Sequence, residues 1–254
     1  MTTTFVRDTA TVFSREFAPT VRRPLGLLFS MGQPLLFLFL FGPMLGGATG
    51  VGGTDGTPWQ WFVPGILIMM CLSGPMAAGY SLLLDLGGGS MERMLVTPLN
   101  RTAMLVGRTL KEFVVLLAQA ALIICLAVPL GFQVRPLGVL AGLALLLVLG
   151  LGLSSLSFVL AIASYPSGQL FYAVTQMAMF PLLLLSGVLL PVESGPGWLR
   201  TLALLNPVGY IVEAARALFD GRFTEPEVLY GALAAGAVAL VGLVLGTRAM
   251  RRGV

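Results

Sequence analysis

The sequence contains no histidine, and its only cysteines are Cys71 and Cys125. Both cysteines lie inside apolar runs, where a thiol packs as a small hydrophobic group. A disulfide framework and a His/Cys metal site both need more of these residues than the chain supplies. We therefore expect no metal site, and we interpret both cysteines as packing residues.

Lysine is nearly absent as well, since Lys111 is the only one in 254 residues. It follows Thr109 and Leu110, so the G-x-x-x-x-G-K-[ST] pattern of a phosphate-binding loop occurs nowhere in the chain. We expect the chain to be no enzyme, with no ATPase site and no cofactor of its own. Energy from ATP would have to reach it through a partner protein.

Charged residues make up only 10% of the chain, against 57% hydrophobic residues and a mean hydropathy of +0.93. This composition is that of a membrane protein. From Pro136 to Val192 there is no Asp, Glu, Lys or Arg. That gap disfavours a proton-coupled carrier and an intramembrane hydrolase, because both need reactive or ionisable groups inside the bilayer.

Long apolar runs fill most of the chain, and a helix that crosses the hydrocarbon needs roughly 20 mainly apolar residues. The stretch 137–190 is too long for one span and is divided by the turn signal Ser-Tyr-Pro-Ser-Gly at 164–168. The sequence predicts an all-α membrane protein with six transmembrane helices in a single domain over residues 1–254. The predicted helices cover residues 25–46, 61–84, 112–131, 137–163, 169–190 and 228–247.

Small residues recur within these predicted spans. Such residues let the backbones of neighbouring helices approach closely. We interpret them as packing positions: Ser154, Ser155, Ser157, Gly138-x-x-x-Gly142 and Gly242-x-x-x-Gly246.

The positive charges are distributed unevenly over the two sides of the predicted membrane. Eleven of the fifteen Lys and Arg residues fall in residues 1–24, 85–111 and 248–254, all on one side. Positive charge is retained in the cytoplasm, so both termini and the loop 85–111 are expected there, and the segment 191–227 is expected outside. Insertion topology and anionic lipid account for this charge, so no nucleic-acid partner is expected.

Residues 1–24 precede the first span and show helical spacing of apolar residues. Val6, Ala10, Phe13 and Phe17 would share one face of a helix. The pattern predicts an amphipathic helix that lies in the membrane interface. A frayed polar tail is the alternative.

The loop 85–111 holds a polar island, GGGSMERMLVTPLNRTAMLVGR at 87–108. Three glycines end the preceding span, Ser90 is suited to cap a new helix, and Glu92 suits the positive end of that helix. The island mixes apolar anchors with both signs of charge, which is typical of a helix that fits into another protein's groove. The alternative is a loop whose charges only fix topology.

This island, together with LLLLSGVLLPVESGPGWLRTLALLNPVGYIVEAAR at 182–216, resembles the membrane subunits of ABC transporters of the ABC type 2 exporter class. The likeness is greatest to daunorubicin-resistance-like permeases and extends over almost the whole chain, including Gln33-Pro34 in the first span. It implies a homodimer of permeases in the plasma membrane, the inner membrane of the cell. Two ABC ATPase subunits would carry ATP and Mg, while the lipid bilayer surrounds the permeases.

The resemblance also assigns roles to particular residues. It places an ATPase-coupling helix at Glu92, Arg93, Met94 and Leu95, with Arg101 beside it. It further implies short re-entrant helices within 191–216, between the fifth and sixth spans, and the prolines there independently exclude one regular helix. The expected outer gate comprises Pro191, Glu193, Trp198, Asn206, Pro207 and Glu213, with an ordinary external loop as the alternative.

Uncharged spans predict a lipophilic or amphiphilic cargo, such as a drug, a natural product or a lipid-linked molecule, exported by alternating access. Methionine side chains adapt to ligands of different shapes, so the methionine-rich parts of the spans are candidates for the substrate pathway. Ordinary helix packing would give the same pattern of residues. The candidate pathway residues are Met69, Met70, Met76, Phe171, Tyr172, Met177 and Met179. The alternatives are a lipid or glycan exporter permease and a structural or assembly membrane protein that transports nothing.

Overall fold

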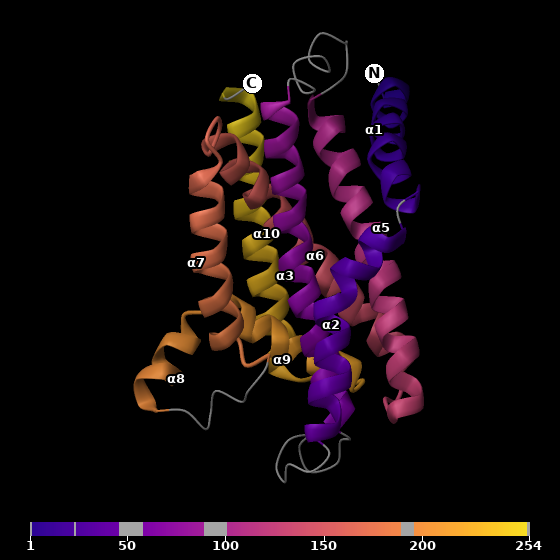
Figure 1. The fold of residues 1–254 in the computed structure, drawn as a ribbon. Coiled ribbons are helices and arrows are strands. Elements are labelled where there is room, and N and C mark those ends of the chain that lie inside the picture. The colour runs from indigo at the N-terminus through magenta and orange to yellow at the C-terminus, as the bar shows by residue number, and fades with distance from the viewer. Residues whose placement is uncertain (1, 23, 46–57, 89–100, 189–195, 253–254) are drawn as a thin grey trace.

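The computed structural model describes residues 2–22, 24–45, 58–88, 101–188 and 196–252. Every element of regular structure in these ranges is a helix (Figure 1). Several helices begin at a proline, whose fixed φ suits the first helical position and whose missing N–H costs nothing there. The helices are α1 (Thr2–Arg22), α2 (Pro24–Leu45), α3 (Pro58–Gly87), α5 (Arg101–Ala127), the 3-10 turn η1 (Val128–Leu130), α6 (Pro136–Ala163), α7 (Gln169–Leu185), α8 (Gly197–Leu204), α9 (Pro207–Phe219) and α10 (Pro226–Arg252).

Four helices in the described part of the chain are long and apolar enough to cross a membrane: Pro58–Gly87, Val106–Leu130, Pro136–Ala163 and Pro226–Ala249. They confirm the predicted spans at 61–84, 112–131, 137–163 and 228–247. The bent pair of α8 and α9 raises the number of candidate spans to five. The other two predicted spans fall on α2 and α7, whose apolar stretches, Ser30–Gly42 and Gln169–Leu185, are shorter.

The predicted division of residues 137–190 is confirmed. α6 ends at Ala163 and α7 begins at Gln169. Gly168 between them has φ +69°, a left-handed conformation that glycine adopts without strain. This turn reverses the chain, so α6 and α7 run in opposite directions (Figure 1).

Figure 1 shows the start of α1 and the end of α10 at one end of the bundle, where α3 ends and α5 begins. We call this the inner end. The opposite, outer end holds α8 and α9, drawn in orange. The start of α1 and the end of α10 therefore lie at the same end of the bundle.

α3 forms the centre of the bundle. Of the residues in its apolar stretch 67% are buried, against 22% for those of α5 and α10. A helix that is apolar all round is expected in such a central place. A large core cluster joins it to α5, α6 and α9, and a smaller one at the inner end joins it to α1, α6 and α7.

Close backbone contacts join α6 to α9 and α10. A Cβ on Gly138 would overlap the Leu218 carbonyl oxygen, and one on Gly242 would overlap the Gly152 carbonyl oxygen. Gly142 faces the Phe219 ring. The predicted packing role of these small residues is confirmed, because they lie where a larger side chain would separate the helices.

α1 is helical as predicted, but it packs differently from the predicted apolar face. Val12 is its buried residue and lies against Gly107 of α5, while Val6 is 66% exposed. Val12 lies near Gly107, and Glu16 pairs with Arg108, so α1 runs in the same direction as α5 (Figure 1). The face that holds Val6 points away from α5. Because α1 runs alongside α5, which contains a candidate span, its direction in the structure differs from that of a helix lying in the membrane interface.

We predict that Gly152→Ala destabilises the bundle. The added Cβ would lie 2.7 Å from the backbone nitrogen and Cα of Ala239, so α10 must move away. The expected loss is about 1–3 kcal/mol, the usual cost of overpacking. Thermal unfolding in detergent measures it. Gly236→Ala on α10, where a Cβ meets no atom within 4 Å, is the matched control. Equal Tm values for the two variants would contradict this packing.

Candidate functional site

Three charged residues meet at the inner end and form the inner ion-pair cluster: Glu16, Asp85 and Arg108. Arg108 on α5 lies 3.2 Å from Glu16 of α1 and also pairs with Asp85 near the end of α3. Its side chain is only 5% exposed. One guanidinium therefore links three helices that are distant in sequence.

The inner ion-pair cluster depends on burial for its strength. A buried guanidinium is costly unless carboxylates and hydrogen bonds compensate its charge, and breaking such a pair usually costs several kcal/mol. The Nη1 atom of Arg108 has no hydrogen-bond partner among the described residues. The two carboxylates therefore provide most of the compensation.

The predicted coupling residues lie next to this cluster in sequence. Glu92, Arg93, Met94 and Leu95 are outside the described residues. Arg101 begins α5, and its side chain is also outside them. Asp85 and Arg108 border the polar island, and the structure assigns Arg108 to internal packing and not to a free loop surface. The sequence carries no signal that separates Arg108 from the other arginines of the island.

At the outer end α8 and α9 meet at an angle of 83°. Pro207 opens α9, and the Asn206 side chain caps it by accepting a hydrogen bond from the Val208 N–H at 3.0 Å. The Asn206 amide also donates to the Leu182 carbonyl of α7 at 2.9 Å. One asparagine therefore both starts α9 and fixes it to α7. The described part of the predicted re-entrant segment is thus a bent pair of helices.

Arg216, near the end of α9, is buried like Arg108. Its Nε donates to the Trp61 carbonyl at 3.2 Å, and Nη2 donates to the Gly187 carbonyl at 2.8 Å. The guanidinium carbon lies 4.0 Å from the centre of the Trp61 ring, a cation–π contact. Glu213 pairs with Nη1 at 2.8 Å and is itself exposed. Arg216 therefore joins α9 to the start of α3 and the end of α7.

The remaining predicted gate residues are not gathered around Arg216. Trp198 on α8 is 65% exposed. Pro191 and Glu193 lie outside the described residues.

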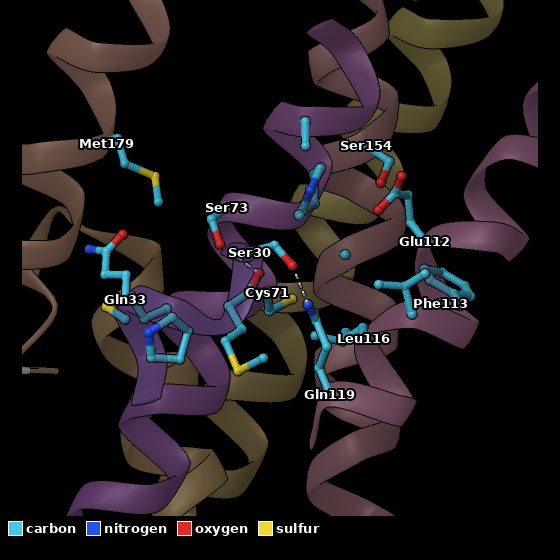
Figure 2. Close-up of a pocket in the computed structure, with 18 of the residues that line it drawn as sticks. Ser30, Gln33, Cys71, Ser73, Glu112, Phe113, Leu116, Gln119, Ser154 and Met179 are labelled. Atoms are coloured by element: carbon cyan, nitrogen blue, oxygen red, sulfur yellow. Dashed lines mark hydrogen bonds between the residues drawn. The ribbon is translucent and has the colours of Figure 1, made fainter. Parts of the chain in front are cut away.

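A cavity of about 720 Å³ lies between the helices on the inner side of the bundle's middle (Figure 2). Its lining comes from the end of α1 and from α2, α3, α5, α6 and α7, and most of it is apolar. Sites of this size and composition are typical of small-molecule binding. The labelled residues in Figure 2 are Ser30, Gln33, Cys71, Ser73, Glu112, Phe113, Leu116, Gln119, Ser154 and Met179.

Polar groups occupy definite places in this cavity. Lys111 and Glu112 form an ion pair at 2.7 Å, with side chains 20% and 11% exposed. The Gln119 amide donates to the Ser30 hydroxyl at 3.0 Å, across the gap between α5 and α2. Ser154 of α6 is fully buried, and its hydroxyl has no hydrogen-bond partner among the described residues. Glu112 is the first residue of the predicted span 112–131, and its side chain is largely enclosed.

The structure brings together three of the predicted pathway residues: Met69, Met70 and Met179 all line the cavity. The other four lie elsewhere. Phe171 is buried in the inner core cluster, Tyr172 packs on Tyr80 with ring centroids 5.4 Å apart, and Met177 is 81% exposed. Met76 is half-buried outside the lining. On α7, Met179 lines the cavity and Met177 does not, because residues two apart on a helix point to nearly opposite sides.

Comparison with known protein families matches residues 7–219 to the family described as ABC-2 type transporter. Among known proteins, ycf38 of Cyanophora paradoxa is 31% identical over 219 residues, which cover 85% of this chain and 75% of that protein. The daunorubicin resistance ABC transporter permease protein DrrB1 of Streptomyces coeruleorubidus is 28% identical over 223 residues, covering 86% and 77%. The ycf38 protein of Pyropia yezoensis is 28% identical over 251 residues, covering 94% and 85%.

We predict that Arg108→Met releases α1 from the bundle. The substitution leaves two carboxylates close together without their cation, at an expected cost of about 3–5 kcal/mol. Hydrogen exchange over Thr2–Arg22 should rise, and the apparent Tm should fall. Arg222→Met is the matched control, because Arg222 also pairs with two carboxylates but is 50% exposed, and should cost about 0–1 kcal/mol. Unchanged exchange in α1 would contradict the role of Arg108.

We predict that Arg216→Lys loosens α9 although the charge is kept. An ammonium cannot reach the Trp61 and Gly187 carbonyls in the fixed planar arrangement that a guanidinium provides. The expected loss is about 1.5–3 kcal/mol, the value of one hydrogen bond of a charged group. Faster hydrogen exchange in Pro207–Phe219 measures it, with Arg222→Lys as the control. Equal exchange in both variants would show that charge alone holds the outer bend.

Proposed function

The chain belongs to the ABC-2 type transporter family, and from this premise we propose that it exports lipophilic or amphiphilic compounds by alternating access. As a member of this family it is a multi-pass membrane permease that works with ATPase subunits. The chain itself has no ATPase activity and needs no cofactor. Direction of transport, cargo class and subunit numbers belong to the proposal.

One observation carries the proposal: the cavity and the inner ion-pair cluster share α5. Arg108 connects α5 to α1 and α3, and one turn further along the same helix Lys111 and Glu112 line the cavity. A packed helix moves as a rigid element, so a displacement at its inner end also moves the cavity wall. The geometry therefore supports a path from an inner-end partner to a bound cargo.

We propose that the movement of the ATPase subunits is transmitted to the permease through the loop 85–111. Closure of two ATPase subunits around ATP and Mg would press on a coupling helix at Glu92, Arg93, Met94 and Leu95, with Arg101 at the start of α5. Asp85 near the end of α3 and Arg108 on α5 lie on either side of this coupling helix in the sequence and are joined by an ion pair, so α3 and α5 would move together. α1 would follow through Glu16.

We propose that the outer bend closes the pathway on the other side. Irregular backbone at membrane depth is tolerated where protein covers it. Asn206 and Arg216 attach α9 to α7 and α3, which supports a rigid closed gate that opens when these helices separate. The remaining proposed gate residues are Pro191, Glu193, Trp198, Pro207 and Glu213.

The complete unit in this proposal has six spans per chain, with α2 and α7 as the additional two. Two permeases form a homodimer in the plasma membrane, with the inner end in the cytoplasm. A cavity lined mainly by apolar side chains supports a lipophilic cargo. The name of the relative DrrB1 includes the words daunorubicin resistance, so daunorubicin belongs in the panel of compounds to be tested, next to neutral and zwitterionic amphiphiles.

The first experiment measures the ATPase rate of the purified complex in lipid, this chain with its candidate ATPase, with and without daunorubicin and other lipophilic compounds. Stimulation by such compounds supports drug export. Stimulation only by lipid-linked glycans favours the alternative cargo class. Failure to form a stable complex with any ATPase would make the export proposal wrong.

We predict that Glu92→Arg weakens association with the ATPase, because it reverses a charge on the proposed docking helix. Insertion should be unaffected, since the inner loop becomes more positive. Co-purification of the two subunits measures the effect. Glu227→Arg, the same reversal in the first turn of α10 at the outer end, is the control and should leave co-purification unchanged. Normal co-purification and normal transport by Glu92→Arg would remove this helix from the mechanism.

A further inference from the structure

We propose that the cavity selects a cargo whose polar end carries no net charge, either a zwitterion or a neutral group that both donates and accepts hydrogen bonds. The inference rests on the proposed export function and adds to it a rule for the cargo's polar end. It is drawn from the charges and hydrogen-bonding groups that line the cavity.

Among the described lining residues, Lys111 and Glu112 are the only ones that carry a charge. They pair with each other at 2.7 Å, so the cavity holds one positive and one negative charge and is neutral as a whole. A cation or an anion entering this largely apolar space would bring a charge that nothing compensates, which is costly at low dielectric. A zwitterion or a neutral polar group brings no such charge.

The ion pair also has hydrogen-bonding capacity left over. An ammonium has three donors and a carboxylate has several acceptor positions, and the contact between them uses only one of each. Next to them in the lining, the Ser154 hydroxyl is fully buried without a hydrogen-bond partner among the described residues. Buried polar groups are normally paired, so an unpaired hydroxyl in a cavity wall indicates a place for a ligand's polar atom.

The side of the cavity away from Lys111 and Glu112 carries no charge and is mostly apolar, and it also holds two amides, Gln33 of α2 and Gln176 of α7. Figure 2 shows Met179 on α7 at one side of the lining and Glu112 and Phe113 on α5 at the other, with Ser73 and Ser30 between them. Phe180 and Leu183 extend the α7 side of the lining. A ligand that spans the cavity would therefore place its apolar body against α7 and its polar end against α5. This arrangement fits an amphiphile.

Gly74 on α3 keeps the space between the two parts open. A Cβ at Gly74 would lie 3.9 Å from Oε2 of Glu112, which is ordinary van der Waals contact. Any longer side chain at this position would reach the carboxylate or fill the space that a ligand needs. Gly74→Leu is therefore a variant that blocks the cavity without altering its charges.

The test uses three photoactivatable dodecyl diazirine probes that differ only in their head groups: phosphocholine, trimethylammonium and sulfate. The full-length permease in lipid nanodiscs, with its ATPase where one binds, is irradiated with each probe. Mass spectrometry then compares labelling of α3 and α5 with labelling of the exposed face of α10. This ratio corrects for differences in how the probes partition into lipid.

The phosphocholine probe should label the cavity helices about tenfold more, relative to α10, than either charged probe, the factor that 1.4 kcal/mol represents. Gly74→Leu should abolish this excess. Gly236→Leu, at an exposed glycine of α10 with no atom within 4 Å of its Cβ, should keep it. Equal labelling by all three probes, or an excess that survives in Gly74→Leu, would overturn the proposal.

Two variants that change the net charge of the cavity test the same rule independently. Glu112→Gln leaves Lys111 unbalanced and should shift the preference to the sulfate probe, whereas Lys111→Met should shift it to the trimethylammonium probe. Because each preference is a ratio within one variant, partial misfolding does not imitate it. An unchanged preference for phosphocholine in both variants would contradict the inference. The labelling needs no ATP hydrolysis, so its failure differs from the absence of an ATPase complex, which would overturn the export function instead.

Discussion

Helices in hydrocarbon gain little by covering their apolar side chains, since lipid tails are as apolar as leucine. What holds this bundle together is close approach of helix backbones, and glycines permit it. Gly152 and Gly242 let α6 and α10 meet at backbone distance, and Gly138 lets α6 reach α9. With that framework in place, α3 is enclosed at the centre and the remaining helices pack around it.

Buried arginines complete the bundle at both ends, and each uses a different set of partners. Arg108 pairs with two carboxylates from α1 and α3, so its interaction depends on charge. Arg216 relies on two backbone carbonyls, an aromatic ring and one exposed carboxylate. The interactions of Arg216 thus depend on the planar geometry of its guanidinium, whereas those of Arg108 depend mainly on charge.

α5 relates these features to the cavity. It carries Arg108 near its inner end, Lys111 and Glu112 one turn later, and Gln119 two turns further along, where Gln119 reaches Ser30 of α2. In the proposed transport cycle a single helix, α5, is thus displaced by the movement of the ATPase subunits and also presents the polar groups that contact the cargo. The adjacent Lys111 and Glu112 neutralise one another, which reconciles charged residues at membrane depth with a lipophilic cargo.

The sequence by itself determined the helical class, four of the spans, the turn at 164–168 and the absence of a phosphate-binding loop, because these depend on local composition and periodicity. The motifs at 87–108 and 182–216 also pointed to the family that the comparisons show. Only the tertiary structure decided that Arg108 and Arg216 are buried, that Glu112 lines a cavity with Lys111, and that Met179 faces it while Met177 does not. Those outcomes depend on which helices become neighbours, and that is set by long-range packing which no local pattern of residues records.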